Sequence, residues 1–183
     1  MLNNLKSLNI LLVEDELEIQ KALEEALLHF FANVYTADNG EEALNVLDEK
    51  VVHAVFTDYE MPKLNGYEFI KEMKKTFHDM PVTIISNHDD RKKLQACIPL
   101  KLYGYLFKPL RYIDLKKYLE TFAIKLGEEG RLQHTFSQSH SLNFIEHTLL
   151  ENETLHQLTK LEFLFLELLI SRSGKVATTE EIV

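Results

Sequence analysis

Five polar residues each follow an apolar stretch of the chain, and together they are suited to phosphoryl chemistry. They are Glu14, Asp15, Asp58, Ser86 and Lys108. Carboxylates gathered in a partly desolvated cleft repel one another, so we expect them to hold a divalent cation, and all-oxygen ligation suits Mg²⁺. Asp58 would be the nucleophile that forms an acyl phosphate. The cation and the Lys108 ammonium would neutralise the phosphoryl oxygens, and the Ser86 hydroxyl would donate a hydrogen bond to one of them.

These side chains need a scaffold that brings several strand ends to one edge of a sheet. Apolar blocks of strand length alternate with segments whose apolar residues recur at helical spacing, which is the pattern of a parallel sheet with helices on both faces. The predicted strands cover residues 8–13, 33–37, 51–57, 82–85 and 103–107. We therefore predict a doubly wound α/β domain over residues 1–126, with its ligand site at the carboxyl ends of the strands.

Composition narrows the class of protein. The 183 residues, 45% of them apolar, leave room for one full core and a second, partial domain. The formal net charge of −9 argues against a basic surface that binds nucleic acid without specificity. A single cysteine, Cys97, excludes an internal disulfide, and we find no secretory leader and no apolar run near the roughly 20 residues of a membrane span. We expect a cytoplasmic protein with no membrane contact.

Four segments, in this order, resemble the motifs of the receiver domain of bacterial response regulators. They are Leu11-Leu12-Val13-Glu14-Asp15, Thr57-Asp58-Tyr59-Glu60-Met61-Pro62, Gly66-Tyr67-Glu68-Phe69 and Tyr105-Leu106-Phe107-Lys108-Pro109. The resemblance implies a flavodoxin-like sheet with strand order 2-1-3-4-5. It also implies that a sensor histidine kinase donates a phosphoryl group to Asp58, and that the chain is a signalling protein and not an enzyme.

The resemblance further implies a ligand set and a backbone feature. Mg²⁺ would be bound by Glu14, Asp15 and Asp58, with the backbone carbonyl of Glu60 as a further ligand. The peptide bond between Lys108 and Pro109 would be cis, which is tolerable because the second residue is proline.

Ser86 and Tyr105 look like the family's switch pair. Their movement on phosphorylation would change the face formed by the fourth helix, fifth strand and fifth helix. The chain departs from the family pattern at Asn87, where Ala or Gly is usual. Glu60 and His88 lie close to the reacting groups, and we expect Asn87, Glu60 and His88 to modulate the kinetics of phosphorylation.

The resemblance also implies a possible homodimer through this face. Regulators of the OmpR/PhoB type usually dimerise through charge pairs, but here the corresponding places hold Tyr103, Gly104 and Tyr118. We hypothesise that Tyr103, Tyr112 and Tyr118 instead form a more apolar contact surface.

The C-terminal region has a different character. Residues 127–141 are polar and are predicted to be a linker, and 142–158 to form a hairpin around Glu151-Asn152-Glu153. The capping box Thr159-Lys160-Leu161-Glu162 predicts a helix start, and a second box begins at Thr178. Residues 142–183 resemble the start of an OmpR/PhoB-type winged-helix domain. Its DNA-reading parts come later in that fold, so we expect DNA binding only if the domain is completed beyond Val183.

Three outputs remain open at this point. The first is transcription regulation through the winged helix, and the second is a receiver that acts by protein contacts alone. The third, an aspartyl-phosphate phosphohydrolase, requires a second aspartate two residues after the nucleophile to act as acid and base. Glu60 occupies that position, so we rank the phosphohydrolase last.

Overall fold

A computed structural model describes residues 2–87, 91–137 and 139–171. Its main feature is a five-stranded sheet in which all neighbouring strands are parallel, in the order β2-β1-β3-β4-β5. The strands are β1 (Asn9–Val13), β2 (Asn33–Ala37), β3 (Ala54–Thr57), β4 (Val82–Asn87) and β5 (Gly104–Lys108). Both the strand order and the doubly wound α/β architecture are confirmed.

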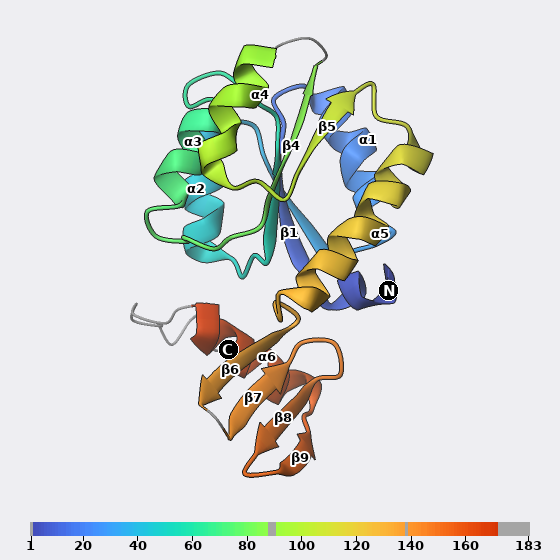
Figure 1. The fold of residues 1–183 in the computed structure, drawn as a ribbon, viewed down its shortest axis with the longest axis vertical. Coiled ribbons are helices and arrows are strands. Elements are labelled where there is room, and N and C mark those ends of the chain that lie inside the picture. Colours follow the sequence, from blue (N-terminus) through green and yellow to red (C-terminus); the bar gives the residue numbers. More distant parts are fainter. Residues whose placement is uncertain (1, 88–90, 138, 172–183) are drawn as a thin grey trace. The chain divides into compact units, whose positions relative to one another are not determined.

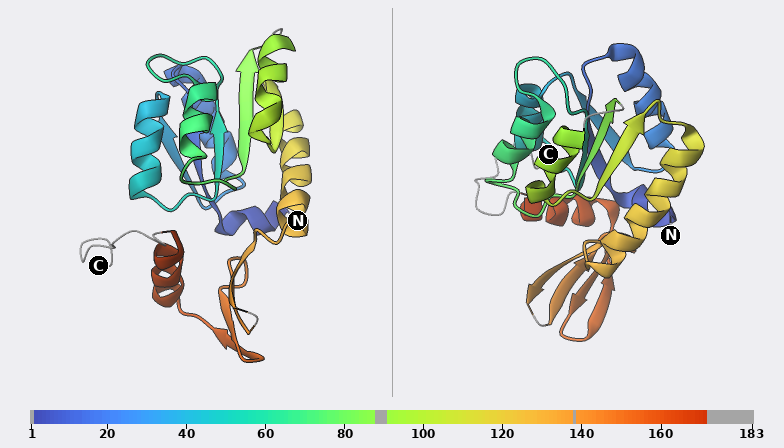
Figure 2. Two further views of the ribbon diagram at one scale, coloured as in Figure 1. Left: turned by 60° about the vertical axis from the view of Figure 1, so that its left-hand side comes forward. Right: turned by 45° about the horizontal axis from the view of Figure 1, so that its top comes forward.

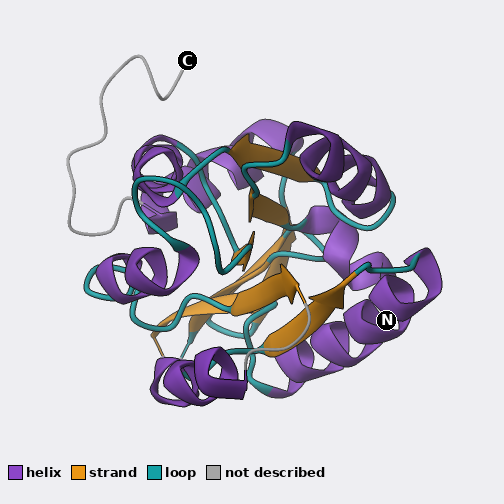
Figure 3. Ribbon diagram, turned by 90° about the horizontal axis from the view of Figure 1, so that it is seen from above, coloured by secondary structure: helices purple, strands orange, loops and turns teal. Residues whose placement is uncertain are grey.

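Helices alternate with the strands and cover both faces of this sheet. Helices α2, α3 and α4 lie on one face, and α1 and α5 lie on the other (Figure 1), so that helices flank the strands on both sides (Figure 3). Successive strand residues point to opposite faces, and Ile10 to Val13 are all nearly or fully buried, so both layers pack closely on β1. The helices are α1 (Leu17–Leu28), α2 (Gly40–Glu49), α3 (Gly66–Met73), α4 (Arg91–Cys97) and α5 (Tyr112–Glu128), with 3-10 helices η1 (Leu2–Ser7) and η2 (Ile98–Leu100).

Two asparagine caps fix the loops that enter α2 and α3. The side chain of Asn39 accepts a hydrogen bond from the Glu42 N–H at 3.2 Å, and that of Asn65 accepts one from the Glu68 N–H at 3.0 Å. Each bond satisfies a backbone donor that the first helical turn leaves free. The second cap defines the end of the loop that begins at Asp58.

The chain divides into two compact units, residues 1–122 and 123–183, and α5 continues across the boundary. The second unit contains an antiparallel sheet in the order β6-β7-β8-β9, with helix α6 (Lys160–Ser171) beside it (Figure 2). Its strands are β6 (Gln133–Ser137), β7 (His140–Asn143), β8 (Thr148–Glu151) and β9 (Thr154–Gln157).

The prediction of a linker over 127–141 was wrong in its second half. Strand β6 pairs with β7, with Gln133 opposite Asn143 and His134 opposite Leu142. An edge strand keeps one side toward solvent and tolerates polar side chains, which is why its composition resembled a linker. The predicted hairpin arm over 142–150 is also interrupted, because the Asn143 side chain accepts from two following N–H groups and starts a turn after β7.

The turn between β8 and β9 and the start of α6 agree with the predictions. Residues 152 and 153 both have positive φ, as a tight hairpin turn requires. The Thr159 hydroxyl accepts from the Glu162 N–H at 3.3 Å, and the Glu162 carboxylate accepts from the Thr159 N–H at 2.8 Å. The second capping box lies outside the described residues. Over the part of the chain that the structure describes, no helix is both long and apolar enough to cross a bilayer.

Candidate functional site

The predicted acidic residues meet at the carboxyl edge of the five-stranded sheet. Glu14 and Asp15 directly follow β1, and Asp58 directly follows the adjacent strand β3. One carboxylate oxygen from each of the three lies within 4.8 Å of the others. Glu14 and Asp58 are buried, whereas Asp15 is exposed. The sequence therefore brings three oxygen ligands together at the place that the fold predicted.

Backbone donors hold the Asp58 carboxylate. The N–H groups of Tyr59 and Glu60 both donate to Asp58 Oδ1, at 2.5 and 3.2 Å. The Thr57 hydroxyl donates to the Asp58 carbonyl oxygen at 2.9 Å. One carboxylate oxygen is thus fixed by the chain itself, which leaves Oδ2 for other partners.

A glycine permits the close approach of α3 to this loop. A Cβ atom at Gly66 would lie 1.9 Å from the Asp58 carbonyl oxygen, and the Gly66 N–H donates to the Tyr59 carbonyl at 3.0 Å. Any larger residue would push α3 away from the loop that carries Asp58. Gly66 was part of the motif in the sequence, and this contact gives its physical reason.

Lys108, the last residue of β5, lies between two buried carboxylates. Its Nζ is 2.5 Å from Asp58 Oδ2 and 2.6 Å from Glu14 Oε2. Burial lowers the pKa of the Lys108 ammonium, but its hydrogen bonds and charge interactions with Asp58 and Glu14 outweigh burial, so this pKa lies above its usual value. Burial also raises the pKa of the Glu14 carboxyl, with Lys108 opposing the rise. Both directions agree with one cation shared by two buried anions. The Lys108-Pro109 bond is cis.

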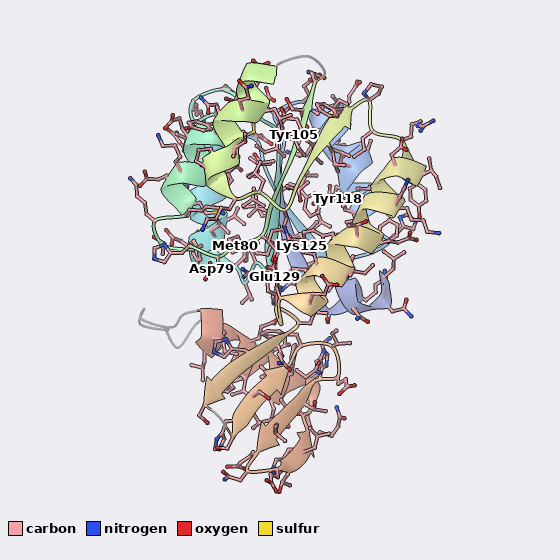
Figure 4. The ribbon with its side chains drawn as sticks, viewed as in Figure 1. Asp79, Met80, Tyr105, Tyr118, Lys125 and Glu129 are labelled. Atoms are coloured by element: carbon pink, nitrogen blue, oxygen red, sulfur yellow. The ribbon has the colours of Figure 1, made fainter. Side chains whose placement is uncertain are left out.

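Ser86 and Tyr105, the predicted switch pair, are in contact. Ser86 lies within β4 and is buried, and Tyr105 lies on β5, on the side of the sheet that α4 covers (Figure 4). Burial raises the pKa of the Tyr105 phenol, and a side-chain hydrogen bond with Ser86 opposes the rise. A hydroxyl at the site is therefore linked to an aromatic ring beside α4.

Two of the three predicted modulating residues, Glu60 and Asn87, are exposed. Glu60 is exposed, and its side chain points to an ion-pair partner on α4. Asn87 is exposed at the end of β4, where it lines a groove of about 440 Å³ together with Lys108, Pro109 and residues of α1. His88 lies outside the described residues.

Two functional contacts were missed in the sequence. Gln20 is buried on α1, and its amide donates to the Glu14 carbonyl at 2.8 Å and to Asp38 Oδ1 at 2.9 Å, which fixes the backbone of the acidic pair. A glutamine on the apolar side of an amphipathic helix was the available signal. The second is Lys93, which lies in a basic run of the kind typical of a solvated helix face but forms an ion pair with Glu60.

Tyr118, one of the three tyrosines of the hypothetical contact surface, makes close contacts inside the domain. Its phenol is 2.5 Å from the Thr83 hydroxyl of β4, and a Cβ atom at Gly104 would lie 2.4 Å from its ring, so Tyr118 fills the space between α5 and the sheet (Figure 4). Burial raises its pKa to about 12. Tyr103 packs against Phe122, at 5.6 Å between ring centroids. The Tyr118 ring therefore requires a glycine at position 104.

The comparison with known families decides the identity of the first unit. The sequence profile of the response regulator receiver domain matches residues 10–120. The chain belongs to this family. Among response regulators, it is 32% identical to the probable transcriptional regulator ycf27 of Guillardia theta, over 95% of this chain and 70% of that protein.

Similarity to other response regulators extends into the second unit. The response regulator DrrB of Thermotoga maritima, an OmpR/PhoB homologue, is 26% identical, with a TM-score of 0.57 over 96% of this chain and 77% of that one. The N-terminal domain of an uncharacterized protein from Wolinella succinogenes is 30% identical, with a TM-score of 0.60, and covers 66% of this chain and 98% of its own. The first similarity includes the strand-rich C-terminal segment, and the second is largely confined to the receiver.

Proposed function

We propose that this response regulator accepts a phosphoryl group on Asp58 from a sensor histidine kinase. The observation that carries the proposal is the environment of the Asp58 carboxylate. Two N–H groups hold Oδ1, while Oδ2 lies 2.5 Å from the Lys108 ammonium at the edge where Glu14 and Asp15 also lie. A carboxylate oxygen held in place beside a cation is what an in-line attack on phosphorus requires.

The donor set fits Mg²⁺. Glu14, Asp15 and Asp58 supply carboxylate oxygens within reach of one another, and the Glu60 backbone carbonyl follows two residues after Asp58. Hard divalent cations prefer such oxygen ligands. When bound, Mg²⁺ would offset negative charge on the phosphoryl oxygens.

The remaining groups of the site act by position and charge. An oxygen of Asp58 forms the new bond to phosphorus as the bond to the donor breaks, and Lys108 then neutralises the phosphoryl oxygens. Ser86 donates a hydrogen bond to one of them. That hydroxyl is now shared with Tyr105, so its movement toward phosphate would release the ring and alter the α4–β5–α5 face.

The output that we propose is transcription regulation. Relatives named as probable transcriptional regulators align with almost the whole chain. We propose a receiver over 1–126, a short connection from residue 127 to the start of β6, and the N-terminal part of a winged-helix domain over the residues that follow. DNA contact would require the DNA-reading parts of the winged-helix domain, which come later in that fold. A homodimer through the α4–β5–α5 face would place two copies of the chain on one DNA site.

The proposal is tested with the Asp58→Asn variant and intact mass spectrometry. After incubation with acetyl phosphate and Mg²⁺, we expect the parent chain to gain the mass of one phosphoryl group and Asp58→Asn to gain none. Asp114→Asn is the matched control, because Asp114 is an exposed carboxylate of α5 whose ion-pair partner is Arg111. Phosphoryl incorporation into Asp58→Asn equal to that of the control would refute the assignment.

A further inference from the structure

Helix α4 reaches the two residues whose backbone holds Asp58. Lys93 lies on α4, and its ammonium forms an ion pair with Glu60 Oε1 and lies 5.3 Å from the centroid of the Tyr59 ring. Tyr59 and Glu60 are also the residues whose N–H groups donate to Asp58 Oδ1. One lysine side chain therefore contacts the side chains of both backbone donors.

The surroundings of Lys93 make this contact more than an ordinary surface pair. Its side chain is 25% exposed, whereas that of Glu60 is 66% exposed. Lys93 is thus partly covered, and its charge lies against an aromatic face, where a cation–π contact adds to the ion pair. The Tyr59 ring in turn packs 6.4 Å from Tyr67 of α3, so the contact links α4 to the loop after β3 and to α3.

We propose that Lys93 is a positioning residue for phosphoryl transfer to Asp58. By holding the side chains of Tyr59 and Glu60, Lys93 keeps their N–H groups aimed at Asp58 Oδ1. It also neutralises the exposed Glu60 carboxylate, which would otherwise repel a negatively charged phosphodonor. The inference rests on the proposed function of Asp58. It adds that the position of α4 affects the rate at which Asp58 is phosphorylated.

The same contact can also carry a coupling at equilibrium. If the contacts of Lys93 with Tyr59 and Glu60 change the free energy of phosphorylating Asp58, then phosphorylation changes the free energy of those contacts by the same amount. Lys93 therefore supplies a second connection from the site to α4, besides the one through Ser86 and Tyr105.

The chain offers a closely matched control. Lys71 of α3 lies 5.3 Å from the Tyr67 ring centroid and pairs with Glu68 at 3.3 Å. It reproduces the chemistry of Lys93, a lysine over a tyrosine ring with a glutamate partner. The backbone donors to Asp58 Oδ1 are Tyr59 and Glu60, so Lys71→Met removes a similar pair whose partners are not these donors.

The experiment measures the initial rate of acyl phosphate formation with acetyl phosphate and Mg²⁺. Lys93→Met is compared with Lys71→Met, Lys93→Arg, Glu60→Gln and the double variant Lys93→Met/Glu60→Gln, after melting curves confirm that each folds. We expect Lys93→Met to be slower by about fivefold, from loss of a partly covered charge pair. Lys93→Arg should retain most of the rate, because arginine keeps the charge and the ring contact. The double variant should be faster than Lys93→Met, since it no longer carries an unneutralised Glu60.

The outcomes separate this inference from the proposed function. Equal rates for Lys93→Met and Lys71→Met, with the parent chain phosphorylated on Asp58, would overturn the role of Lys93 and leave the acceptor assignment intact. A slow Lys93→Arg would overturn it as well, because it would show that the rate does not follow the charge. If the parent chain takes up no phosphoryl group, the proposed function fails and the role of Lys93 fails with it.

Discussion

The two compact units differ in which of their charged and apolar side chains are buried. In the first unit, both faces of the sheet are covered, and buried charges gather at one edge, where Glu14, Asp58 and Lys108 contact one another. In the second unit, helix α6 buries Phe163 but leaves several large apolar side chains exposed, namely Leu161, Leu164, Phe165 and Leu169. Folding free energy should therefore depend strongly on single residues in the first unit and weakly on the outer residues of α6.

The largest effect is expected for Lys108→Met. It would leave two buried carboxylates without their shared cation, and removal of one member of a buried pair destabilises by about 3–5 kcal/mol. The control is Lys75→Met, because Lys75 pairs with Glu72 at 2.6 Å but both side chains are more than half exposed; such pairs contribute about 0–1 kcal/mol. Chemical denaturation without divalent cations measures both. A similar small loss in the two variants would contradict the comparison.

The loss in Lys108→Met should also grow with pH. Burial already raises the pKa of Glu14 in the folded protein, so the folded state holds this proton more tightly than the unfolded chain does. Ionisation of Glu14 therefore lowers stability as the pH rises above the unfolded value and through the folded one. Without Lys108 this pKa rises further. We expect the loss of unfolding free energy in Lys108→Met, relative to the parent chain, to be larger at about pH 8 than at about pH 5. A loss that does not change with pH would show that these charges are not its cause.

The next effect is expected for Gly66→Ala. The added methyl group would overlap the Asp58 carbonyl oxygen, and forced overpacking of a tight contact destabilises by about 1–3 kcal/mol. Gly127→Ala is the control, since a Cβ there meets only Leu132 at 3.7 Å and Gly127 lies within α5. That change should stabilise by about 0.5–1 kcal/mol through helix propensity. Thermal unfolding shows whether each variant is less or more stable than the parent chain. An unchanged stability of Gly66→Ala would show that the loop after β3 adjusts to the added methyl group.

A smaller effect is expected for Tyr118→Phe. It removes the phenol that contacts Thr83, whose side chain is fully buried, and an unsatisfied buried hydroxyl destabilises by about 1–2 kcal/mol. Tyr112→Phe serves as the control, because Tyr112 is 53% exposed.

The titration of Tyr118 gives a second test. Its pKa is raised from 10.0 to about 12, so the folded state keeps a proton that the unfolded chain releases, and stability falls as the pH rises through this window. The ultraviolet absorbance of phenolate should include a component that titrates at about 12 and is absent in Tyr118→Phe. If all tyrosines titrate near 10, Tyr118 is accessible to solvent.

Much of the fold and of the acidic site could be predicted from the sequence, because the relevant signals are local. An apolar run that ends in an acid marks both a buried strand and the residue at its carboxyl end, so Glu14 and Asp58 could be placed before any contact was known. The same logic placed Lys108 at the end of β5. Parallel strand order then brought these ends together.

The remaining contacts could not be predicted because they join side chains from distant elements. Lys93 belongs to a basic run typical of a solvated helix face, and only the packing of α4 beside the loop after β3 turns it toward Glu60. Tyr118 and Gly104 were interpreted as departures from the family's dimer surface. In the structure the Tyr118 ring packs against Gly104, where a larger residue would clash with it. Strand β6 was missed because its polar composition lacks the alternation that identifies a half-buried strand.

The smallest effect is expected for Leu161→Gln, in the outer part of α6. Leu161 is 74% exposed, so its replacement removes little buried area and should change stability by no more than about 0.5 kcal/mol. Phe163→Ala is the control, because Phe163 is 4% exposed and stacks at 3.9 Å on the His147 ring; loss of a buried phenylalanine destabilises by about 3–5 kcal/mol. Amide hydrogen exchange over residues 140–171 reports the opening of this unit alone. Equal loss of protection in the two variants would mean that Leu161 is covered in solution, and the contrast between the two units would then be smaller than their exposures indicate.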